Sequence, residues 1–397
     1  MKSEVSATVV GGAGHVGLPL AVMLAARGVQ TLIFDINAES VNLINAGKSP
    51  FYEPGLQSVL EETRNVDMVR ATTNPSEIAS TEFVIVVVGT PVHEYLSPDP
   101  GIITSTIETL TPHLRDGQHL VLRSTVYPGV TRMVESVIGK SKRKVTVSFC
   151  PERIAQGKAM TELSELPQIV ASRTPEGVAA ARRLFGVLSE TLVEVSPEEA
   201  ELAKLFTNTW RYIKFAAANQ LFMIANEWGV DFERVRHAIV TEYPRASDMP
   251  AAGFAAGPCL FKDTMQVAAF SNNMFSLGHA AMAVNEGLPA YVVTRMSQRF
   301  NLATMRVGVL GMAFKAESDD TRSSLAYKLR KLLALHSAEV LCADDNVSTD
   351  TSLVSEQQLL HDVDIVVIGT PHDRYRHLKI KQPVVDIWNI RESGVLL

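Results

Sequence analysis

The stretch Ala7–Gly17 reads ATVVGGAGHVG, and it decides the fold. Its first half is a short β-branched run that enters a glycine-rich turn. An apolar helical pattern follows from Leu18 to Ala26, and Thr31–Asp35 is a second apolar run that ends in an acid. The order strand, G-x-G-x-x-G, helix, strand, acid is typical of a dinucleotide-binding unit. The sequence therefore predicts an α/β domain of the Rossmann type with a parallel sheet.

Each part of this turn has a physical task. The first glycine makes the tight turn, the second lets the backbone approach a pyrophosphate, and the third lets the helix pack on the strand. The helix N-terminus then faces the phosphates. Asp35 would accept hydrogen bonds from the ribose hydroxyls, and no Arg follows it, so NAD is favoured over NADP. The candidate cofactor-binding residues of the turn are Gly12, Gly14, His15, Val16 and Gly17.

Three further uninterrupted apolar runs predict parallel strands that are buried on both faces. They span Phe83–Val88, His119–Leu122 and Val145–Ser148. Ligands of such sheets bind at the carboxyl ends of the strands. Thr90, Thr125 and Glu152 follow the three runs, so we expect them to converge on one rim. Each of them alone could equally be an ordinary turn residue at a strand end.

The pattern changes to helix from Pro197 to about Trp228, and helical patterns also fill Asp231–Val240 and Asp263–Arg299. The first of these helices carries four residues at helical spacing, which places them on one face. They are Ala200, Lys204, Asn208 and Arg211. A Lys and an Asn one turn apart are unusual on an apolar stripe and indicate a functional face. The alternative is the solvated edge of an amphipathic helix.

Gly253–Thr264 reads GFAAGPCLFKDT and places Cys259, Lys262 and Asp263 within five residues. A thiol reacts as its thiolate, which a neighbouring ammonium favours, and a carboxylate can hold a water for a later hydrolysis. The small residues around the cysteine would let a substrate approach the backbone closely. The local sequence alone leaves a second interpretation open, in which the cysteine is a buried small hydrophobe and the two charges a solvated pair.

The last hundred residues return to an α/β pattern. Met305–Leu310 and Asp362–Ile368 read as strands, and DIVVIGTP at 364–371 echoes VIVVVGTP at 84–91. The repeat predicts two Rossmann-like domains with parallel sheets joined by a central helical segment. We expect an NAD-binding domain at 1–196, a helical domain with the cysteine loop at 197–302, and a second Rossmann-like domain at 303–397.

Composition excludes several classes of protein. The chain has 397 residues, a net charge of −6 and no basic cluster, which argues against nucleic acid as a partner. No apolar stretch is long enough for a membrane span, and the N-terminus lacks the pattern of a signal peptide. Three widely spaced cysteines fit neither a disulfide framework nor a zinc site, so no metal site is expected. These features predict a cytoplasmic protein.

Several motifs together resemble the UDP-glucose/GDP-mannose 6-dehydrogenase family from end to end. In chain order they are GGAGHVG, VVGTP, RSTVYPGVT, CPERIAQG, AELAKLFTN, GPCLFKD and FKAESDDTR. The resemblance implies an N-terminal NAD domain, a central helical dimerisation segment and a C-terminal nucleotide-sugar domain, in a homodimer. It also implies oxidation of the C6 alcohol of a nucleotide sugar to a carboxylate with two NAD, through a cysteine-bound thioester.

The resemblance assigns roles to individual residues. Cys259 matches the nucleophile, and Lys262 and Asp263 match the base and acid beside it. Lys204 matches a lysine that stabilises negative charge on the C6 oxygen, and Asn208 matches an asparagine that donates a hydrogen bond to it.

Four further residues match positions with known tasks in the family. Thr125 and Glu152 match residues that hold the water and relay protons. Lys315 and Arg322 match cations that reach the substrate or the partner subunit.

Departures from the UDP-glucose pattern concern the sugar. Gln156 replaces a second glutamate and cannot act as a base. Arg153, Arg211 and the Tyr243-Pro244-Arg245 turn resemble the branch that oxidises UDP-N-acetylhexosamines, although that branch often lacks a lysine at position 262. We therefore expect Arg153, Arg211, Tyr243 and Arg245 to bind the substrate, with Lys262, Lys315 and Arg322.

Two other functions stay open at this point. A one-step alcohol dehydrogenase of the hydroxyacid type also joins a Rossmann domain to helices, but it needs neither the cysteine nor a second α/β domain. A regulator that binds NAD and a nucleotide sugar without turnover would fit the altered Gln156. UDP-glucose itself remains the alternative substrate.

Overall fold

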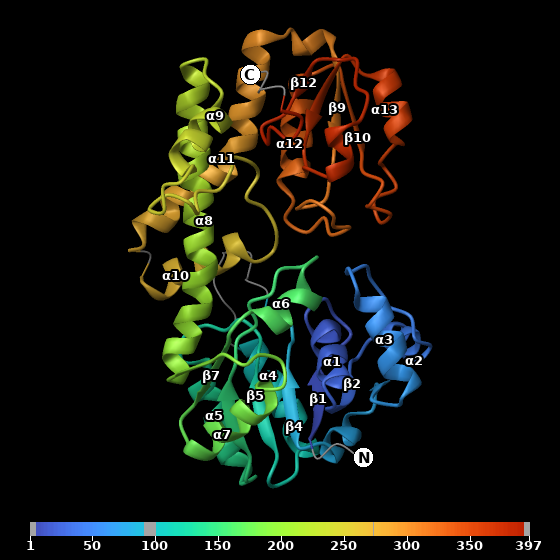
Figure 1. Ribbon diagram of the computed structural model, residues 1–397, viewed down its shortest axis with the longest axis vertical. Helices are drawn as coiled ribbons and strands as arrows, with labels where there is room; N and C mark the ends of the chain where they lie inside the picture. The colour runs from blue at the N-terminus through green and yellow to red at the C-terminus, as the bar shows by residue number, and fades with distance from the viewer. Residues whose placement is uncertain (1–4, 91–100, 273, 393–397) are drawn as a thin grey trace. The chain divides into compact units, whose positions relative to one another are not determined.

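The computed structural model describes residues 5–90, 101–272 and 274–392 (Figure 1). Pro91, which ends the first of the two Gly-Thr-Pro turns of the sequence, lies outside the described residues. The chain divides into two compact units, one that ends at Phe206 and one that begins at Thr207.

The first unit contains an eight-stranded sheet in the order β3-β2-β1-β4-β5-β6-β7-β8. Neighbouring strands are parallel except β6 and β7, which are antiparallel. The chain order reverses direction between β1 and β4, which is where dinucleotides bind to such sheets. The strands are β1 Ser6–Val10, β2 Gln30–Phe34, β3 Val69–Thr72, β4 Phe83–Val86, β5 His119–Leu122, β6 Thr146–Phe149, β7 Gln168–Ser172 and β8 Leu192–Val195.

The helices of the first unit bury apolar faces against this sheet. In α1 the sequence is apolar almost throughout, and Leu18, Leu20 and Leu24 are fully buried between the sheet and neighbouring helices. Burying each such side chain contributes about 1.5–3 kcal/mol. The chain turns away after the helix at Gly28, whose φ of +89° favours glycine. The helices are α1 Gly17–Ala26, α2 Ala38–Asn45, α3 Leu56–Asn65, α4 Gly101–Leu110, α5 Val130–Ser141, α6 Ala159–Glu165 and α7 Pro175–Phe185, with 3-10 turns at Pro75–Ser80 and Thr111–His113.

The helical region that follows consists of α8 Pro197–Glu227, α9 Phe232–Val240, α10 Leu260–Phe270 and α11 Ser276–Arg299. The predicted helical stretch Asp263–Arg299 is therefore two helices, and the first begins three residues earlier than expected. The interruption contains Asn272 at a φ of +53°. Asparagine tolerates this left-handed conformation better than most residues, and it ends the helix there.

The second sheet has four parallel strands in the order β10-β9-β11-β12. The two similar stretches that end in Gly-Thr-Pro contain β4 and β11. These strands occupy equivalent positions in the two sheets, because β4 pairs with β1, the first strand of its sheet in the chain, and β11 pairs with β9, the first strand of the other. The strands are β9 Arg306–Leu310, β10 Glu339–Ala343, β11 Ile365–Ile368 and β12 Val384–Val385, and the helices are α12 Leu325–Ala334 and α13 Glu356–Asp362, with 3-10 turns at Leu302–Thr304 and Asp373–Arg376.

One predicted strand boundary is wrong. Asp362 does not begin the strand but ends α13, and the strand starts at Ile365. The cause is the N-cap residue Ser355, whose hydroxyl accepts the Gln358 N–H at 3.2 Å and so caps the first turn of α13.

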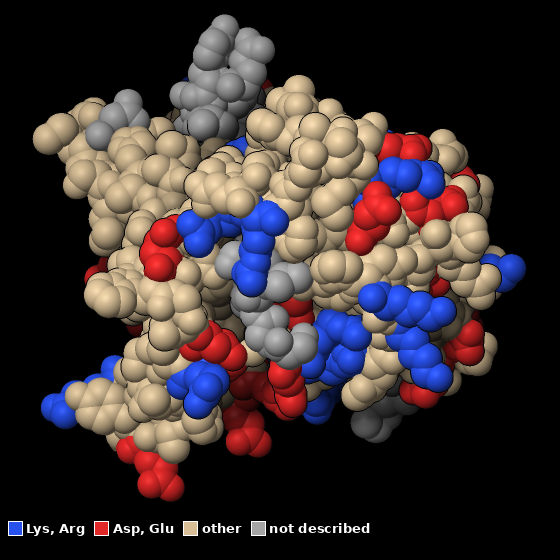
Figure 2. All heavy atoms as spheres, turned by 90° about the horizontal axis from the view of Figure 1, so that it is seen from above, with Lys and Arg blue, Asp and Glu red and all other residues tan. Residues whose placement is uncertain are grey.

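Two surface observations concern possible partners. Within the described residues, none of the helices combines the length and the apolar character that crossing a membrane requires. Basic and acidic side chains are interspersed on the face seen in Figure 2. This mixture agrees with the small net charge of −6 over 397 residues.

Candidate active site

The glycine turn after β1 leaves space only at its middle glycine. A Cβ on Gly12 would lie 2.6 Å from the Val9 carbonyl oxygen, and one on Gly17 would lie 2.6 Å from the Gly11 carbonyl oxygen. On exposed Gly14 the nearest atom would be 3.7 Å away. Two of the glycines are thus required by the fold, whereas Gly14 leaves the backbone open to a ligand. The left-handed φ of +73° belongs to Gly11 rather than to Gly12, where the tight turn was expected.

The surroundings of this turn fit a dinucleotide. Val16 caps α1 without a side-chain hydrogen bond in this described part of the chain, so the first N–H groups of the helix can bind phosphate oxygens. Asp35 follows β2, is half-buried, and fixes the turn by accepting the Ala13 N–H at 3.0 Å. The His15 ring stacks on Phe51 with 4.0 Å between ring centroids.

The structure brings together the residues predicted at the rim of the first sheet. The Thr90 hydroxyl donates to the Thr125 carbonyl oxygen at 2.7 Å. Glu152, which is only 7% exposed, accepts a hydrogen bond at 2.9 Å from Nε of Arg123, two residues before Thr125. The sequence analysis found Thr90, Thr125 and Glu152 but not Arg123.

Two buried glutamates of the first unit were also missed. Glu201 on α8 is fully buried and accepts the backbone N–H groups of Gly129 at 2.6 Å and Thr131 at 2.8 Å, at the start of α5. Glu53 accepts the Gly157 N–H at 2.7 Å and so holds the end of the CPERIAQG loop. Both carboxylates satisfy backbone donors that a loop or a helix N-terminus leaves unpaired.

The environments of the three cysteines differ sharply. Cys150 and Cys342 are buried, and burial raises the pKa of each thiol to about 12. Cys259 is exposed and precedes α10 as its N-cap residue. A helix N-terminus stabilises negative charge, which a thiolate nucleophile requires. The structure therefore supports Cys259 as the reactive thiol.

A buried carboxylate, one oxygen of which accepts no hydrogen bond from the described residues, lies one turn along α10 from this thiol. Asp263 is 1% exposed, and Asn208 on α8 donates to its Oδ2 at 2.6 Å. Its Oδ1 lies 3.6 Å from Nζ of Lys262 and, among the described residues, accepts no hydrogen bond. Lys204, 9% exposed, precedes Asn208 by one turn of α8. A buried unsatisfied acceptor is costly, so a ligand or water is expected to fill it.

The cysteine loop is held by aromatic side chains from distant parts of the second unit. A Cβ on Gly253, at a φ of +150°, would lie 2.1 Å from the Trp388 ring. One on Gly257, at a φ of +102°, would lie 2.5 Å from the Phe314 ring. The Asn219 side chain bonds both the N–H and the carbonyl oxygen of Gly253, at 2.9 and 3.0 Å. These contacts fix the backbone that leads to Cys259.

Two cations predicted in the FKAESDDTR motif lie in one loop. Arg322 donates to Asp320 through both Nε, at 3.0 Å, and Nη2, at 2.6 Å. The pKa of Arg322 is raised, mainly by the hydrogen bond to Asp320 and in smaller part by negative charge at Cys259. Lys315 is half-buried in the same loop.

The three arginines expected to select the sugar have different surroundings. Arg153 is half-buried and donates to the carbonyl oxygen of Pro167. Arg211 and Arg245 are exposed, and the Arg245 guanidinium lies 4.8 Å from the centre of the exposed Tyr243 ring. Arg153 already has a protein partner, whereas the side chains of Arg211 and Arg245 are exposed.

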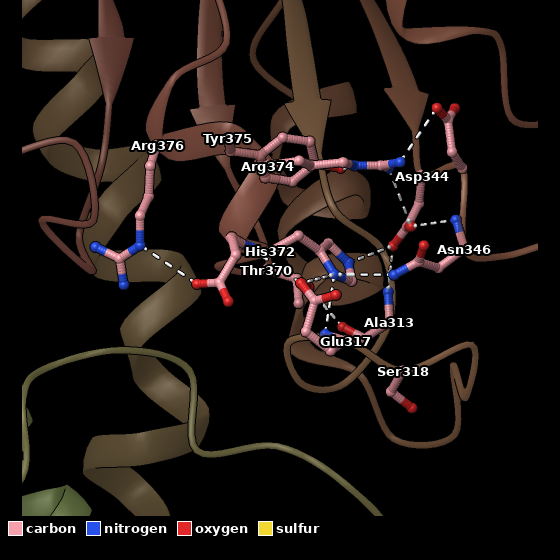
Figure 3. A network of polar contacts seen from close by, with 12 residues as sticks. Ala313, Glu317, Ser318, Asp344, Asn346, Thr370, His372, Arg374, Tyr375 and Arg376 are labelled. Atoms are coloured by element: carbon pink, nitrogen blue, oxygen red, sulfur yellow. Dashed lines mark hydrogen bonds and ion pairs between the residues drawn. The ribbon is translucent and has the colours of Figure 1, made fainter. Parts of the chain in front are cut away.

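The second sheet has an acid in the place of Asp35, but this acid is fully used by the protein. Asp344 follows β10 and accepts the N–H groups of Met312 and Ala313 at 2.7 and 3.0 Å. His372 lies against it with Nε2 3.1 Å away, as Figure 3 shows. Neither side chain has exposed surface. The second sheet therefore lacks the open acceptor that the ribose of a dinucleotide would use.

Comparison with known proteins matches three successive parts of the chain to domains of one family. Residues 6–189 match the NAD binding domain of the UDP-glucose/GDP-mannose dehydrogenase family, residues 198–287 its central domain, and residues 308–393 its UDP binding domain.

Individual relatives cover almost the whole chain. A UDP-N-acetyl-D-mannosamine dehydrogenase of Methanococcus maripaludis (strain C7) is 28% identical over 93% of this chain and 86% of its own. The structure of the UDP-N-acetyl-mannosamine dehydrogenase Cap5O from Staphylococcus aureus is similar with a TM-score of 0.84 and 28% identity, covering 97% of this chain and 95% of that one. A UDP-glucose dehydrogenase from Pyrobaculum islandicum gives 0.90 and 26%, covering 99% and 96%.

These matches extend over all three parts of the chain, and they agree with a glycine turn that fits NAD and with an exposed cysteine loop. The chain belongs to the UDP-glucose/GDP-mannose dehydrogenase family, whose members are NAD-dependent nucleotide-sugar dehydrogenases.

Proposed function

We propose that this enzyme oxidises the C6 alcohol of a UDP-N-acetylhexosamine to the uronate, removing four electrons with two NAD. The observation that carries the proposal is exposed Cys259 at the start of α10, with Asp263 one turn along the same helix, where its Oδ1 accepts no hydrogen bond from the described residues. A thiol allows the second oxidation to proceed from a covalent adduct, and a carboxylate oxygen can take a proton from water.

In the first oxidation, Lys204 and Asn208 act on the C6 oxygen. NAD, when bound at the glycine turn, accepts the hydride that leaves C6 in each oxidation. The Lys204 ammonium stabilises negative charge as the hydroxyl proton leaves, and Asn208 donates a hydrogen bond to the same oxygen. The bond from Asn208 to Asp263, at 2.6 Å, orients the amide and leaves its second N–H for the substrate.

The second oxidation takes place on the cysteine. The Cys259 thiolate adds to the aldehyde carbon, the new C–S bond forms, and the carbonyl oxygen becomes the oxygen of a thiohemiacetal. Loss of a second hydride from C6 then leaves a thioester. The aldehyde is not released into solution before the second oxidation, because the thiolate attacks it where it forms.

Hydrolysis returns the enzyme to its starting state. Water adds to the thioester carbon, the C–S bond breaks, and the sulfur leaves as the Cys259 thiolate. We assign the ordering of this water to Thr125 and Glu152, and the acceptance of its proton to the Oδ1 of Asp263. The balance is one alcohol, one water and two NAD consumed per carboxylate.

The choice of sugar gives the direct test. An N-acetyl group needs a hydrogen-bond donor, and Arg245 and Arg211 are exposed donors. Losing a charged donor to a buried acceptor costs about 1.5–3 kcal/mol, or roughly ten- to a hundred-fold in specificity. We expect kcat/KM for UDP-N-acetylmannosamine or a related N-acetylhexosamine to exceed that for UDP-glucose by this factor, with NADH formation as the assay.

Arg245→Met should narrow this gap, whereas Arg182→Met, at a surface pair with Glu194, should leave it unchanged. A parent enzyme that prefers UDP-glucose would contradict the proposed sugar. It would leave the oxidation itself intact as a UDP-glucose 6-dehydrogenase reaction.

We also propose a homodimer built on α8. One apolar stripe of this helix, continued by Trp228 directly after its last residue, is exposed at successive spacings of 4, 11, 3 and 4 residues, which place the side chains on one helix face, a pattern typical of helix pairing. Its members, with their exposed fractions, are Phe206 49%, Trp210 57%, Leu221 44%, Ile224 49% and Trp228 81%.

Introducing Ile224→Glu together with Trp228→Glu should convert the dimer to a monomer in sedimentation equilibrium, because two charges would be buried unpaired. Val66→Glu, at a 66% exposed position of the first unit, is the matched control and should leave the mass unchanged. A monomeric parent protein would refute this assembly.

A cytoplasmic location fits the proposed reaction. NAD and nucleotide sugars are cytoplasmic metabolites, and the buried Cys150 and Cys342 are free thiols, as expected in a reducing compartment.

A further inference from the structure

His372 lies four residues after β11, and its side chain has no exposed surface. Both ring nitrogens are bonded: Nε2 lies 3.1 Å from Oδ2 of Asp344, and Nδ1 accepts the backbone N–H of Glu317 at 3.1 Å. Because a backbone N–H can only donate, Nδ1 carries no hydrogen, and the hydrogen on Nε2 is donated to the carboxylate. The protein therefore fixes the tautomer of this histidine.

The orientation of the His372 ring is fixed as well. Tyr375 packs against it edge-on, with 5.4 Å between the ring centroids. Nδ2 of Asn346 lies 3.1 Å from Nδ1, and Figure 3 shows these side chains gathered around the imidazole. Satisfied buried hydrogen bonds make a group rigid, so the ring can serve as a fixed support.

The support acts on residues 312–317, which follow β9 and which we call the β9 loop. Near its start, the Thr370 hydroxyl donates to the Ala313 carbonyl oxygen at 2.5 Å. At its end, Glu317 donates its N–H to the imidazole and accepts the Asp373 N–H on Oε1 at 3.0 Å. The segment that follows β11 therefore holds the β9 loop at both ends.

Lys315 is the cation between these two fixed ends, and its side chain is half-buried. The β9 loop lies at the carboxyl end of a parallel strand, where ligands of such sheets bind. It also lies in the part of the chain that matches the UDP binding domain of the family. An ammonium group is a common partner of phosphate oxygens. The position of Lys315 therefore matters for binding the diphosphate of a nucleotide sugar.

We propose that His372 is a positioning residue for the nucleotide, acting through Lys315; this inference rests on the proposed function. By accepting the N–H of Glu317, the imidazole fixes the end of the β9 loop and holds Lys315 where it meets the diphosphate. His372 itself touches neither the sugar nor the reacting atoms. Its contribution is to the affinity for the nucleotide.

The effect should fall on binding rather than on the oxidations, because the contact of the β9 loop with the cysteine loop is held separately. The Phe314 N–H donates to the Asp320 carbonyl oxygen at 2.9 Å. The Phe314 ring covers Gly257 so closely that a Cβ there would lie 2.5 Å away. Releasing the Glu317 end of the β9 loop should leave both contacts in place, so Cys259 should keep its position.

The test compares two variants that each keep one of the two bonds of the ring. In His372→Asn the side-chain oxygen takes the place of Nδ1 and can still accept the Glu317 N–H. In His372→Gln the amide nitrogen takes the place of Nε2 and can still donate to Asp344. We expect His372→Gln to weaken UDP binding to the full chain about tenfold in isothermal titration calorimetry, the size of one lost hydrogen bond. His372→Asn should stay within about twofold of the parent.

The same difference should appear in turnover. His372→Gln should raise KM for the nucleotide sugar about tenfold, while kcat and KM for NAD stay within about twofold. Each variant loses one buried hydrogen bond, so a merely structural role would lower both melting temperatures and would not separate the two affinities for UDP.

Two further variants test the route of the effect. Lys315→Met should itself weaken UDP binding, and adding His372→Gln to it should change the affinity by no more than about twofold, because the group that the histidine positions is already gone. The matched control is His361→Gln. His361 lies 2.8 Å from Asp362 in the same unit, but its side chain is 87% exposed, so this variant should bind UDP as the parent does.

The outcomes separate this inference from the proposed function. A parent that binds UDP but oxidises no nucleotide sugar refutes the proposed function alone, and a parent that binds no UDP refutes both. Equal affinity for UDP in the two His372 variants, or a full effect of His372→Gln without Lys315, refutes the positioning role alone. If neither variant folds, Thr370→Val frees the β9 loop at Ala313 instead and should weaken UDP binding about fivefold. Parent affinity in that variant would overturn the proposal.

Discussion

Replacing Cys259 by serine should abolish formation of the carboxylate, lowering it by at least about a thousand-fold, while NAD and the nucleotide sugar bind as before. The serine hydroxyl is a far weaker nucleophile than a thiolate at neutral pH, and the second oxidation has no other adduct to start from. In the parent enzyme we expect two NADH per sugar and no free aldehyde, counted by absorbance with an amine reagent present as a trap.

The matched control for this variant is Cys342→Ala. Cys342 is buried on β10 of the second sheet, where burial raises its pKa to about 12, so we expect its thiol to take no part in the reaction. Its replacement should lower stability and leave the NADH stoichiometry at two. Unchanged turnover in Cys259→Ser, or a parent reaction that stops at one NADH with trapped aldehyde, would show that the chemistry is a one-step oxidation.

Gly253→Ala should destabilise the second unit by about 3–5 kcal/mol. The new Cβ would lie 2.1 Å from the Trp388 ring, and a φ of +150° is unfavourable for any residue with a side chain. Urea denaturation followed by tryptophan fluorescence measures the loss. Turnover should fall as well, because this glycine anchors the backbone that leads to Cys259.

Gly287→Ala is the matched control within the same unit. A Cβ there would meet no atom within 4 Å, and the position lies inside α11. It should stabilise the protein by about 0.5–1 kcal/mol, the difference in helix propensity. In a double-mutant cycle, Trp388→Ala should offset part of the cost of Gly253→Ala. Additive losses would mean that the ring does not create the strain.

The cofactor turn could be predicted from sequence because its determinants are local. Strand, turn, helix and acid follow one another within Ala7–Asp35, and each glycine is needed by atoms only a few residues away or by the ligand. The cysteine loop could be singled out for the same reason, because Cys259, Lys262 and Asp263 lie within five residues. Their order and spacing already carry the chemistry.

What the sequence did not predict depends on contacts between distant positions. Arg123 meets Glu152 across two strands, and Trp388 meets Gly253 from more than a hundred residues away along the chain. Neither contact leaves a periodic pattern. The two misplaced boundaries have a different cause. Helical periodicity continues on both sides of Asn272, and a polar cap at Ser355 outweighs the apolar residues that suggested an earlier strand.

The contact of Trp388 with Gly253 also bears on how nature or an engineer can recombine such enzymes. An indole ring from the far end of the chain lies where no side chain fits on the cysteine loop. Residues 207–392 therefore form a single cassette in the described structure. In a chimaera that took only the residues after 302 from a relative, the cysteine loop would pack against a side chain of the relative in place of Trp388. To transfer the sugar preference of one enzyme to another, the cysteine loop and the C-terminal sheet should therefore be exchanged together.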